Sequence, residues 1–318
     1  MLKLEALQER VPPTYPKRSY IEAELGKALA GWRGEQAIDY YLSFLQKENY
    51  VFIHDLRLKD SEGRFFQIDT LLLSQKYHII IEVKNMAGTL YFNNDPQQLI
   101  QTTNSGEKGE KGEKAYNCPI SQVERQQFQL QTFLKNLRPR VPEVPIVFLI
   151  VISNTNTVIR FAPTFKKAKQ CVIQSAVIPE KVTNIHDTFK ADILTQKELK
   201  KIARLLVKHH QVSNPDYLKR FDISRNDLLT GVHCPKCRQI PMQRKRGKWL
   251  CLSCQHSSKD AHIAALHDYF LLIDTTITNQ QLRDFLHLPS ISVASKMLTS
   301  LSLKKDGHYK GCFYSSEE

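Results

Sequence analysis

Three residues that could act together in a chemical step lie in two neighbouring apolar stretches. Asp69 is in the first stretch, and Glu82 and Lys84 are in the second. Both stretches are typical of buried strands, where a charge is costly unless it is paired or bound to a metal ion. Side chains two residues apart on a strand point to the same face, and a short link allows a hairpin. We therefore expect Asp69 to lie beside Glu82 and Lys84.

Two carboxylates that converge inside a sheet repel each other unless a divalent cation neutralises both. We therefore expect Asp69 and Glu82 to bind Mg²⁺ or Mn²⁺. Such an ion polarises a phosphodiester and lowers the pKa of bound water, while Lys84 can orient that water or stabilise developing charge. This chemistry is phosphodiester hydrolysis. The alternative is a structural ion pair, or a group of charges on a solvated face of the sheet.

Four motifs contain or flank these residues, and their order along the chain is informative. They are Gly31-Trp32-Arg33-Gly34-Glu35, Gln67-Ile68-Asp69, Ile81-Glu82-Val83-Lys84-Asn85 and Pro119-Ile120-Ser121-Gln122. The set resembles the nuclease-related domain, NERD, of the PD-(D/E)xK nuclease superfamily, most strongly from about residue 28 to 137. One departure is the isoleucine before Asp69, where the broad superfamily often has proline, although the narrower family tolerates isoleucine.

The resemblance implies a restriction-endonuclease-like α/β fold, in which a mixed sheet is flanked by helices. It also implies that Asp69 and Glu82 are metal ligands and that Lys84 is the catalytic lysine. Glu35 on the first helix and Gln122 on a later helix would complete the catalytic site. The alternatives are a surface carboxylate near the start of a helical turn for Glu35, and a solvated position on an amphipathic helix for Gln122.

The elements that must position these residues follow from the spacing of apolar side chains. Residues 19–46 have helical spacing, and Gly31 and Gly34 are expected to interrupt or bend the helix. Strands are predicted at 51–58, 65–73, 77–83, 88–92 and 145–152, with helices after Pro119 and at 196–210. Residues 95–114 include the polar repeat GEKGEKGEK and predict a mobile surface loop. Together these elements predict a nuclease-like domain over residues 1–220, with a core at about 28–155.

Four of the seven cysteines form two Cys-x2-Cys pairs, Cys234 with Cys237 and Cys251 with Cys254, separated by thirteen residues. Zinc binds four thiolates tetrahedrally, and each pair can supply two of them from one tight turn. The spacing predicts a structural Zn²⁺ ribbon over residues 231–258. A closed four-cysteine site organises a fold and leaves no position for catalysis. Redox-active thiols are the alternative.

The segment between the cysteine pairs is strongly basic. Arg244, Lys245, Arg246 and Lys248 lie beside Trp249. A basic hairpin with an aromatic residue can bind phosphates and stack on a base, so these five residues are candidate nucleic-acid contacts. The alternatives are a solvated hairpin, and a tryptophan that packs in the small core.

The net charge of the whole chain is +13, which indicates a polyanionic partner, with nucleic acid favoured over an anionic membrane. The longest apolar runs are far shorter than the roughly 20 residues of a membrane helix. The N-terminal residues do not resemble a secretory signal, and the scattered cysteines fit a reducing compartment, so we expect a cytoplasmic protein. The sequence does not specify an oligomeric state.

Residues 259–318 predict a helix-turn-helix or winged-helix-like module. Thr278 and Asn279 are typical of a helix start, and Asp306-Gly307 predicts the turn of a hairpin that would form the wing. The segment resembles a winged-helix extension found in some nuclease-related proteins. A helical hairpin that serves only packing is the alternative.

These observations favour a divalent-metal-dependent endonuclease or nickase, with DNA as the expected substrate and the C-terminal modules binding nucleic acid. Two alternatives remain: a non-catalytic DNA-binding or regulatory protein on a nuclease-like fold, and an RNA-processing nuclease. The complete set of Asp69, Glu82 and Lys84 favours an enzyme over the non-catalytic alternative.

Overall fold

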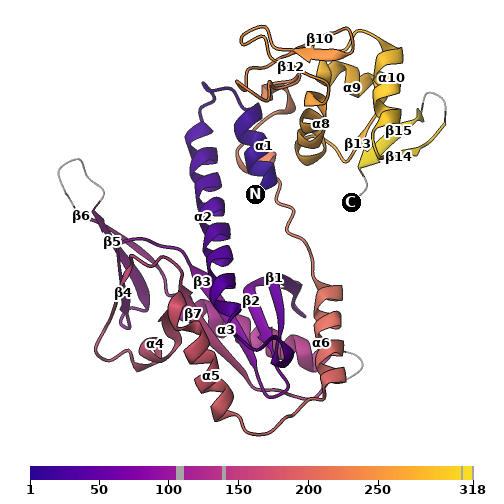
Figure 1. Ribbon diagram of the computed structural model, residues 1–318. Coiled ribbons are helices and arrows are strands. Elements are labelled where there is room, and N and C mark those ends of the chain that lie inside the picture. Colours follow the sequence, from indigo (N-terminus) through magenta and orange to yellow (C-terminus); the bar gives the residue numbers. More distant parts are fainter. Residues whose placement is uncertain (105–110, 138–140, 309–310, 317–318) are drawn as a thin grey trace. The chain divides into compact units, whose positions relative to one another are not determined.

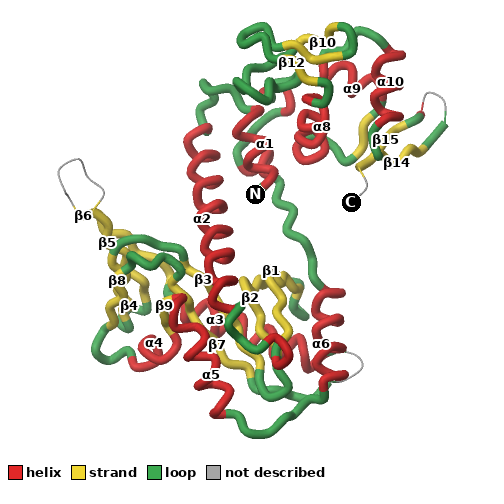
Figure 2. The backbone as a smooth tube through the Cα atoms, in the orientation of Figure 1, coloured by secondary structure: helices red, strands yellow, loops and turns green. Residues whose placement is uncertain are grey.

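The computed structural model describes residues 1–104, 111–137, 141–308 and 311–316 (Figures 1 and 2). The chain forms two compact units. We call Leu29–Asn214 the sheet unit, and Met1–Ala28 together with Pro215–Glu318 the cysteine unit. The first 28 residues thus belong with the C-terminal region, whereas the sequence assigned them to the nuclease-like domain. Helix α2 (Arg18–Leu42) contains the point where the chain passes between the units.

The sheet unit contains the second part of α2, four further helices and nine strands in its described residues. The helices are α3 (Pro119–Asn136), α4 (Lys166–Cys171), α5 (Ile178–Thr188) and α6 (Gln196–His209). The strands are β1 (Val51–Lys59), β2 (Phe65–Leu73), β3 (His78–Lys84), β4 (Thr89–Asn93), β5 (Gln98–Asn104), β6 (Lys111–Asn117), β7 (Ile146–Ile152), β8 (Val158–Phe161) and β9 (Val172–Gln174).

The main sheet has five strands in the order β1-β2-β3-β7-β9. The first three strands pair antiparallel, as the predicted hairpin requires, whereas β3 pairs with β7 and β7 with β9 in parallel. The prediction of a mixed sheet flanked by helices is therefore confirmed.

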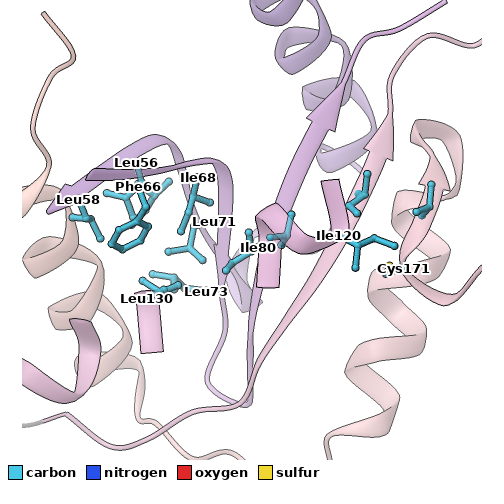
Figure 3. Close-up of a cluster of buried hydrophobic side chains, with 14 of the residues drawn as sticks. Leu56, Leu58, Phe66, Ile68, Leu71, Leu73, Ile80, Ile120, Leu130 and Cys171 are labelled. Atoms are coloured by element: carbon cyan, nitrogen blue, oxygen red, sulfur yellow. The ribbon is translucent and has the colours of Figure 1, made fainter. Parts of the chain in front are cut away.

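Both faces of the main sheet are covered by helices, which explains its long apolar runs. On one face Leu71 and Ile80 belong to a buried cluster with Ile120 and Leu130 of α3 (Figure 3). Leu72 faces the other way, into a second cluster that includes residues of α2 and α5. Because side chains alternate along a strand, both faces of β2 and β3 must be apolar where helices cover them.

A second sheet has the order β6-β5-β4-β8, and it corrects the prediction of a loop at residues 95–114. Strands β5 and β6 pair antiparallel from Gln98↔Asn117 to Asn104↔Lys111. Strand pairing uses backbone groups, so a polar composition does not prevent it where side chains can reach solvent. Residues 105–110 of the repeat lie outside the described residues.

Besides the first part of α2, the cysteine unit contains short helices and two small sheets. The helices are α1 (Leu2–Arg10), α7 (Tyr217–Arg220), α8 (Ala261–Leu272), α9 (Asn279–Leu286) and α10 (Ile291–Ser300). One sheet contains β10 (Gln243–Lys245), β11 (Lys248–Leu250) and β12 (Ser257–Ser258). The other has the order β13-β15-β14, from β13 (Thr276–Ile277), β15 (Phe313–Ser316) and β14 (Leu303–Asp306). No helix in the described ranges is long and apolar enough to span a membrane.

A buried arginine explains why the N-terminal helix belongs to the cysteine unit. The Arg10 side chain is fully buried, and its Nε donates to Asp268 Oδ2 of α8 at 2.9 Å. Its Nη1 donates to the carbonyl oxygens of Leu229 and Gly231, each at 3.0 Å. The guanidinium carbon lies 4.7 Å from the centre of the Phe285 ring. A buried charge requires partners of this kind, so α1 cannot leave the unit without a large cost.

The two glycines of the first motif lie within a continuous helix, so the predicted interruption does not occur. Gly34 is buried at the contact between α2 and the end of β3. A Cβ at this position would lie 2.7 Å from Asn85 Cβ and 2.9 Å from Ser153 Oγ. The Asn85 side chain is also fixed, because its Nδ2 donates to Ala30 O at 2.8 Å. Gly34 therefore allows close approach, whereas nothing lies within 4 Å of a Cβ at the exposed Gly31.

Two Gly→Ala substitutions should have opposite effects on stability. Gly34→Ala should lower the free energy of unfolding by about 1–3 kcal/mol, because the added methyl overlaps a fixed side chain. Gly31→Ala should raise it by about 0.5–1 kcal/mol, because alanine favours the helix and meets no neighbour. Urea denaturation followed by circular dichroism measures both. Equal effects of the two substitutions would show that Gly34 is not needed for close packing.

Candidate catalytic and zinc sites

The candidate catalytic site lies where the backbone pairing of β2 and β3 ends. The last paired residues are Thr70 and Ile81. Asp69 directly precedes Thr70 on β2, just beyond the paired region. Its Oδ2 accepts a hydrogen bond from the backbone N–H of Val83 at 2.8 Å. The carboxylate thus satisfies a backbone donor at the end of the ladder, which fixes the Asp69 side chain beside β3.

Glu82 is the central residue of the site, with 2% of its surface exposed. Its Oε1 accepts hydrogen bonds from Lys84 Nζ at 2.5 Å and from Gln122 Nε2 at 2.7 Å. Its Oε2 accepts from Gln126 Nε2 at 3.2 Å. Lys84 Nζ also donates to Gln122 Oε1 at 3.3 Å, so the ammonium group bridges both side chains. The structure therefore brings Glu82, Lys84 and Gln122 together at the positions that the sequence predicted.

Helix α3 supplies two glutamines, and sequence reasoning found only the first. Gln126 is buried and lies one helical turn after Gln122, so both face the sheet. Besides Glu82, Gln126 Nε2 contacts the Gln67 carbonyl oxygen at 2.8 Å and so connects β2 to the site. The sequence did contain a signal for Gln126. It follows Gln122 by four residues, a spacing that places two side chains on the same face of a helix, and Val123 of that helix is buried.

Two further carboxylates extend the group: Glu35 lies near Glu82, and Asp55 lies near Glu35. Glu35 is partly buried on α2, and burial, followed by the nearby charges of Asp55 and Glu82, raises its pKa to about 7. Asp55 of β1 accepts a hydrogen bond from Gln67 Nε2 at 2.5 Å and has a left-handed backbone with φ of 52°. Aspartate tolerates this conformation better than most residues, and such positions concentrate at functional sites. Nothing in the sequence around Asp55 signalled its place here.

The electrostatics of the site fit a divalent cation. Burial, followed by the charge of Glu82, raises the pKa of Asp69 to about 7, although its hydrogen bond from Val83 opposes the shift. Lys84 contacts Glu82, and its charge opposes the shift of Asp69. Three ionised carboxylates, Asp69, Glu82 and Glu35, would therefore carry more negative charge than this ammonium group neutralises. A cation bound by Asp69 and Glu82 would remove this excess, and carboxylate oxygens are the ligands that Mg²⁺ and Mn²⁺ prefer.

The four cysteines of the two Cys-x2-Cys pairs converge in the cysteine unit. Cys234 Sγ and Cys254 Sγ are 3.6 Å apart, and Cys237 Sγ and Cys251 Sγ are 3.5 Å apart. All four sulfurs lie within 4.8 Å of one another. Zn–S bonds of about 2.3 Å in a tetrahedron require sulfurs about 3.8 Å apart, so the site fits Zn²⁺. In the described part of the chain, these four cysteines form a group of metal-binding side chains (His, Cys, Asp or Glu) that lie close enough together to hold one ion.

The two cysteine pairs have the same local backbone. In the first, Arg238 N donates to Cys234 O at 2.9 Å, and in the second, Gln255 N donates to Cys251 O at 3.0 Å. Arg238 and Gln255 both have positive φ, of 61° and 58°. Each turn therefore presents its two thiols on one side, as expected for a zinc ribbon.

The basic hairpin forms as predicted, but Trp249 is not available to a ligand. Only 1% of its surface is exposed, and its Nε1 donates to His262 Nδ1 of α8 at 3.2 Å. Trp249 therefore belongs to the small core, which corrects its assignment as a base-stacking residue. Arg244 lies over its ring, with the guanidinium carbon 5.1 Å from the centroid.

Removing the charge of Asp69 should stabilise the metal-free sheet unit at high pH. The pKa of Asp69 rises on folding from 3.8 to about 7, so the folded state favours the protonated form. Ionisation of Asp69 therefore lowers the free energy of unfolding. This loss begins as the pH rises above about 4 and is complete above about 7. Asp69→Asn should therefore raise the free energy of unfolding by about 1–3 kcal/mol at pH 8 and change it little at pH 4.

Urea denaturation in metal-free buffer at both pH values measures this effect. Glu124→Gln is the matched control, since Glu124 is on the exposed side of α3 and pairs with Lys167. Saturating Mn²⁺ should reduce the difference in stability between Asp69→Asn and the wild type at pH 8, because a ligand stabilises only a protein that binds it. A less stable Asp69→Asn variant at pH 8 would contradict the electrostatic account.

Loss of one zinc ligand should disorder the hairpin of the cysteine unit. Cys251→Ser should reduce bound zinc well below about one ion per chain, because the site needs four thiolates. Hydrogen exchange should then rise across residues 234–258, since strands of three residues have little stability of their own. Mass spectrometry of metal content and of exchange measures both. Cys312→Ser is the control in the same unit, and equal exchange in the two variants would contradict a structural zinc site.

Comparison with known proteins now identifies part of the chain. The family model described as "NERD: Nuclease-related domain" matches residues 30–153. No curated protein and no solved structure gave a match. The matched range contains Glu35, Asp69, Glu82, Lys84 and Gln122, and the four cysteines lie outside it. The chain therefore carries a nuclease-related domain of the NERD family at residues 30–153, followed by a four-cysteine cluster at 234–254 that fits a zinc ribbon.

Proposed function

We propose that the protein is a divalent-metal-dependent nuclease that hydrolyses phosphodiester bonds, with DNA as the expected substrate. The observation that carries the proposal is the buried carboxylate of Glu82, which Lys84, Gln122 and Gln126 hold opposite Asp69. A decayed site has no need to keep a buried charge with three donors. The nuclease-related domain itself supports the same class of function.

Asp69 and Glu82 would hold the Mg²⁺ or Mn²⁺ ion from adjacent strands. When bound, the ion supplies positive charge to a phosphate oxygen and lowers the pKa of a water molecule. Gln122 and Gln126 fix the orientation of Glu82, because each donates to a different carboxylate oxygen. This arrangement keeps one face of the carboxylate oriented before substrate arrives, as preorganised sites require.

Lys84 and Glu35 would manage charge and protons during hydrolysis. Lys84 Nζ has one donor beyond its two contacts and can place it on a phosphate oxygen or on the attacking water. In hydrolysis the water oxygen bonds to phosphorus, and the bond from phosphorus to the leaving sugar oxygen breaks. Glu35, with a pKa of about 7, is suited to accept the proton that the water loses.

The cysteine unit would bind the nucleic acid. Residues 231–260 carry seven Lys or Arg and one Asp, so the ribbon is strongly positive. After it come α8, β13, α9, α10, β14 and β15, with β13 and β14 on either side of β15. This order of elements supports the winged-helix-like module that the sequence predicted, in which α10 would be the helix nearest nucleic acid.

Cleavage of supercoiled plasmid in Mg²⁺ or Mn²⁺, without chelator, tests the proposal. Glu82→Gln and Asp69→Asn should each reduce the cleavage rate by on the order of a hundredfold or more, because each removes a metal ligand. Lys84→Ala should lower the rate more than it lowers Mn²⁺ affinity, since Lys84 is not a ligand. Isothermal titration of Mn²⁺ separates binding from turnover.

Two substitutions on the same unit are matched controls. Glu124→Gln and Lys167→Ala make the same chemical changes on exposed residues that pair with each other. Both should keep the wild-type rate. If the wild-type protein cleaves neither DNA nor RNA, or if Glu82→Gln cleaves as fast as wild type, the proposed activity is wrong.

A further inference from the structure

A cleft in the cysteine unit lies between the β10–β11 hairpin and α10. Figure 1 labels β10 and α10. Its volume is about 540 Å³, within the range of roughly 300–1,000 Å³ that holds small organic ligands. The residues that line it are Arg244, Arg246, Gly247, His262, Leu288, Pro289, Ser290, Val293, Lys296, Met297 and Ser300.

The lining combines apolar surface with positive charge. Val293 and Met297 of α10 and Leu288 before it provide apolar contacts. Arg246 of the hairpin and Lys296 of α10 add cations from opposite sides, and none of the described lining residues is acidic. The cleft is thus complementary to a ligand with a flat apolar part and a negative charge, which are the features of a nucleotide.

Arg244 is positioned to bind the negative charge of such a ligand. Its guanidinium lies over Trp249, which His262 fixes by a hydrogen bond. Yet its Nη1 is shielded from solvent and has no hydrogen-bond partner among the described residues. A buried donor without a partner is costly, and a phosphate oxygen would satisfy it. The N-terminal end of α10, which Ser290 caps, adds a weaker attraction for anions at the same cleft.

The hairpin separates its four basic residues into two pairs. Arg244 is opposite Trp249, whereas Lys245 is opposite Lys248. Because successive side chains on a strand face opposite ways, Lys245 and Lys248 lie on the face away from the buried tryptophan. Arg246 and Gly247 form the turn, with φ of 47° and 82°, as in a tight two-residue hairpin. Only Arg244 and Arg246 of the four line the cleft.

We propose that this cleft binds one unpaired nucleotide of a nucleic-acid strand, with the base on Val293 and Met297 and the phosphate at Arg246, Arg244 and Lys296. The inference rests on the proposed role of the cysteine unit in nucleic-acid binding and names the site and the substrate form. A base inside a duplex cannot present its face to a cleft, so the site selects single strands over duplexes.

The basic character of the surrounding ribbon favours nucleic acid over an acidic peptide. A strand that continues beyond the cleft meets further cations on the ribbon, where seven Lys or Arg face one Asp over residues 231–260. Each phosphate neutralised adds salt-dependent affinity. A peptide would require acidic residues spaced to match the hairpin, whereas every nucleotide carries both the flat ring and the charge.

Binding of fluorescent twelve-residue oligo-dT and oligo-U strands, followed by anisotropy, tests the cleft with the full-length zinc-loaded protein and no added Mg²⁺ or Mn²⁺. The double variant Arg246→Ala/Lys296→Ala should weaken binding by about fivefold to a hundredfold, the range expected when one nucleotide is no longer held. The matched control Lys245→Ala/Lys248→Ala removes the same charge from the other face and should bind much more tightly than the cleft variant. Comparison of the two strands shows which sugar the site accepts.

Val293→Phe tests occupancy of the cleft without a change of charge. It should weaken binding of the single strand more than binding of a duplex of equal length, because the larger side chain fills the space for the unpaired base. The double cleft variant should also flatten the dependence of log affinity on log salt, by about 0.7 for each phosphate that the protein no longer neutralises. Zinc content and urea denaturation of each variant confirm that it is folded.

Equal affinities of the cleft and control variants, or no effect of Val293→Phe, would overturn the proposed cleft and leave the nuclease proposal intact. Tight binding of an acidic peptide that oligo-dT and oligo-U do not displace would also overturn it. Conversely, single strands that bind through the cleft but are never cleaved would support the cleft while the nuclease proposal fails.

Discussion

The buried charge of Glu82 is the constraint on which the sheet unit depends. A carboxylate with 2% of its surface exposed must be compensated, and Lys84, Gln122 and Gln126 supply the donors. These donors come from two elements, β3 and α3, so the position of α3 over the sheet is fixed by polar contacts as well as by its apolar face. The polar contacts that orient the site therefore also help to fix α3 over the sheet.

The donors do not balance the site when its carboxylates are ionised. Burial, with the nearby charge of Glu82, raises the pKa of both Asp69 and Glu35, and the single ammonium group of Lys84 carries too little charge to neutralise three carboxylates. Such an arrangement would lower the stability of the metal-free protein and would favour the cation that we propose, as functional sites commonly do. A structural ion pair, the alternative that the sequence allowed, would have no reason to gather further carboxylates.

The sequence predicted the parts of the molecule in which residue type and spacing determine the structure. The period of two on β2 and β3 placed Asp69, Glu82 and Lys84 together, and the cysteine spacing gave the cluster at 234–254. It could not place Asp55, because a positive φ within a strand has no signal in residue type here. It also failed for β5 and β6, since backbone pairing does not depend on polar side chains. It failed for α1 as well, because the assignment of this helix depends on long-range contacts of Arg10, among them the one with Asp268.

The zinc site and the proposed cleft are connected through the hairpin between them. Strands β10 and β11 have three residues each, too few to be stable alone. Cys237 precedes the hairpin and Cys251 follows it, so a bound Zn²⁺ would hold both ends, while Trp249 and His262 attach its centre to α8. In this structure Arg244 and Arg246 line the cleft together with residues of α10. If the proposed cleft binds a nucleotide, a metal with no open coordination position would therefore influence that binding, because it would hold the hairpin that forms one wall of the cleft.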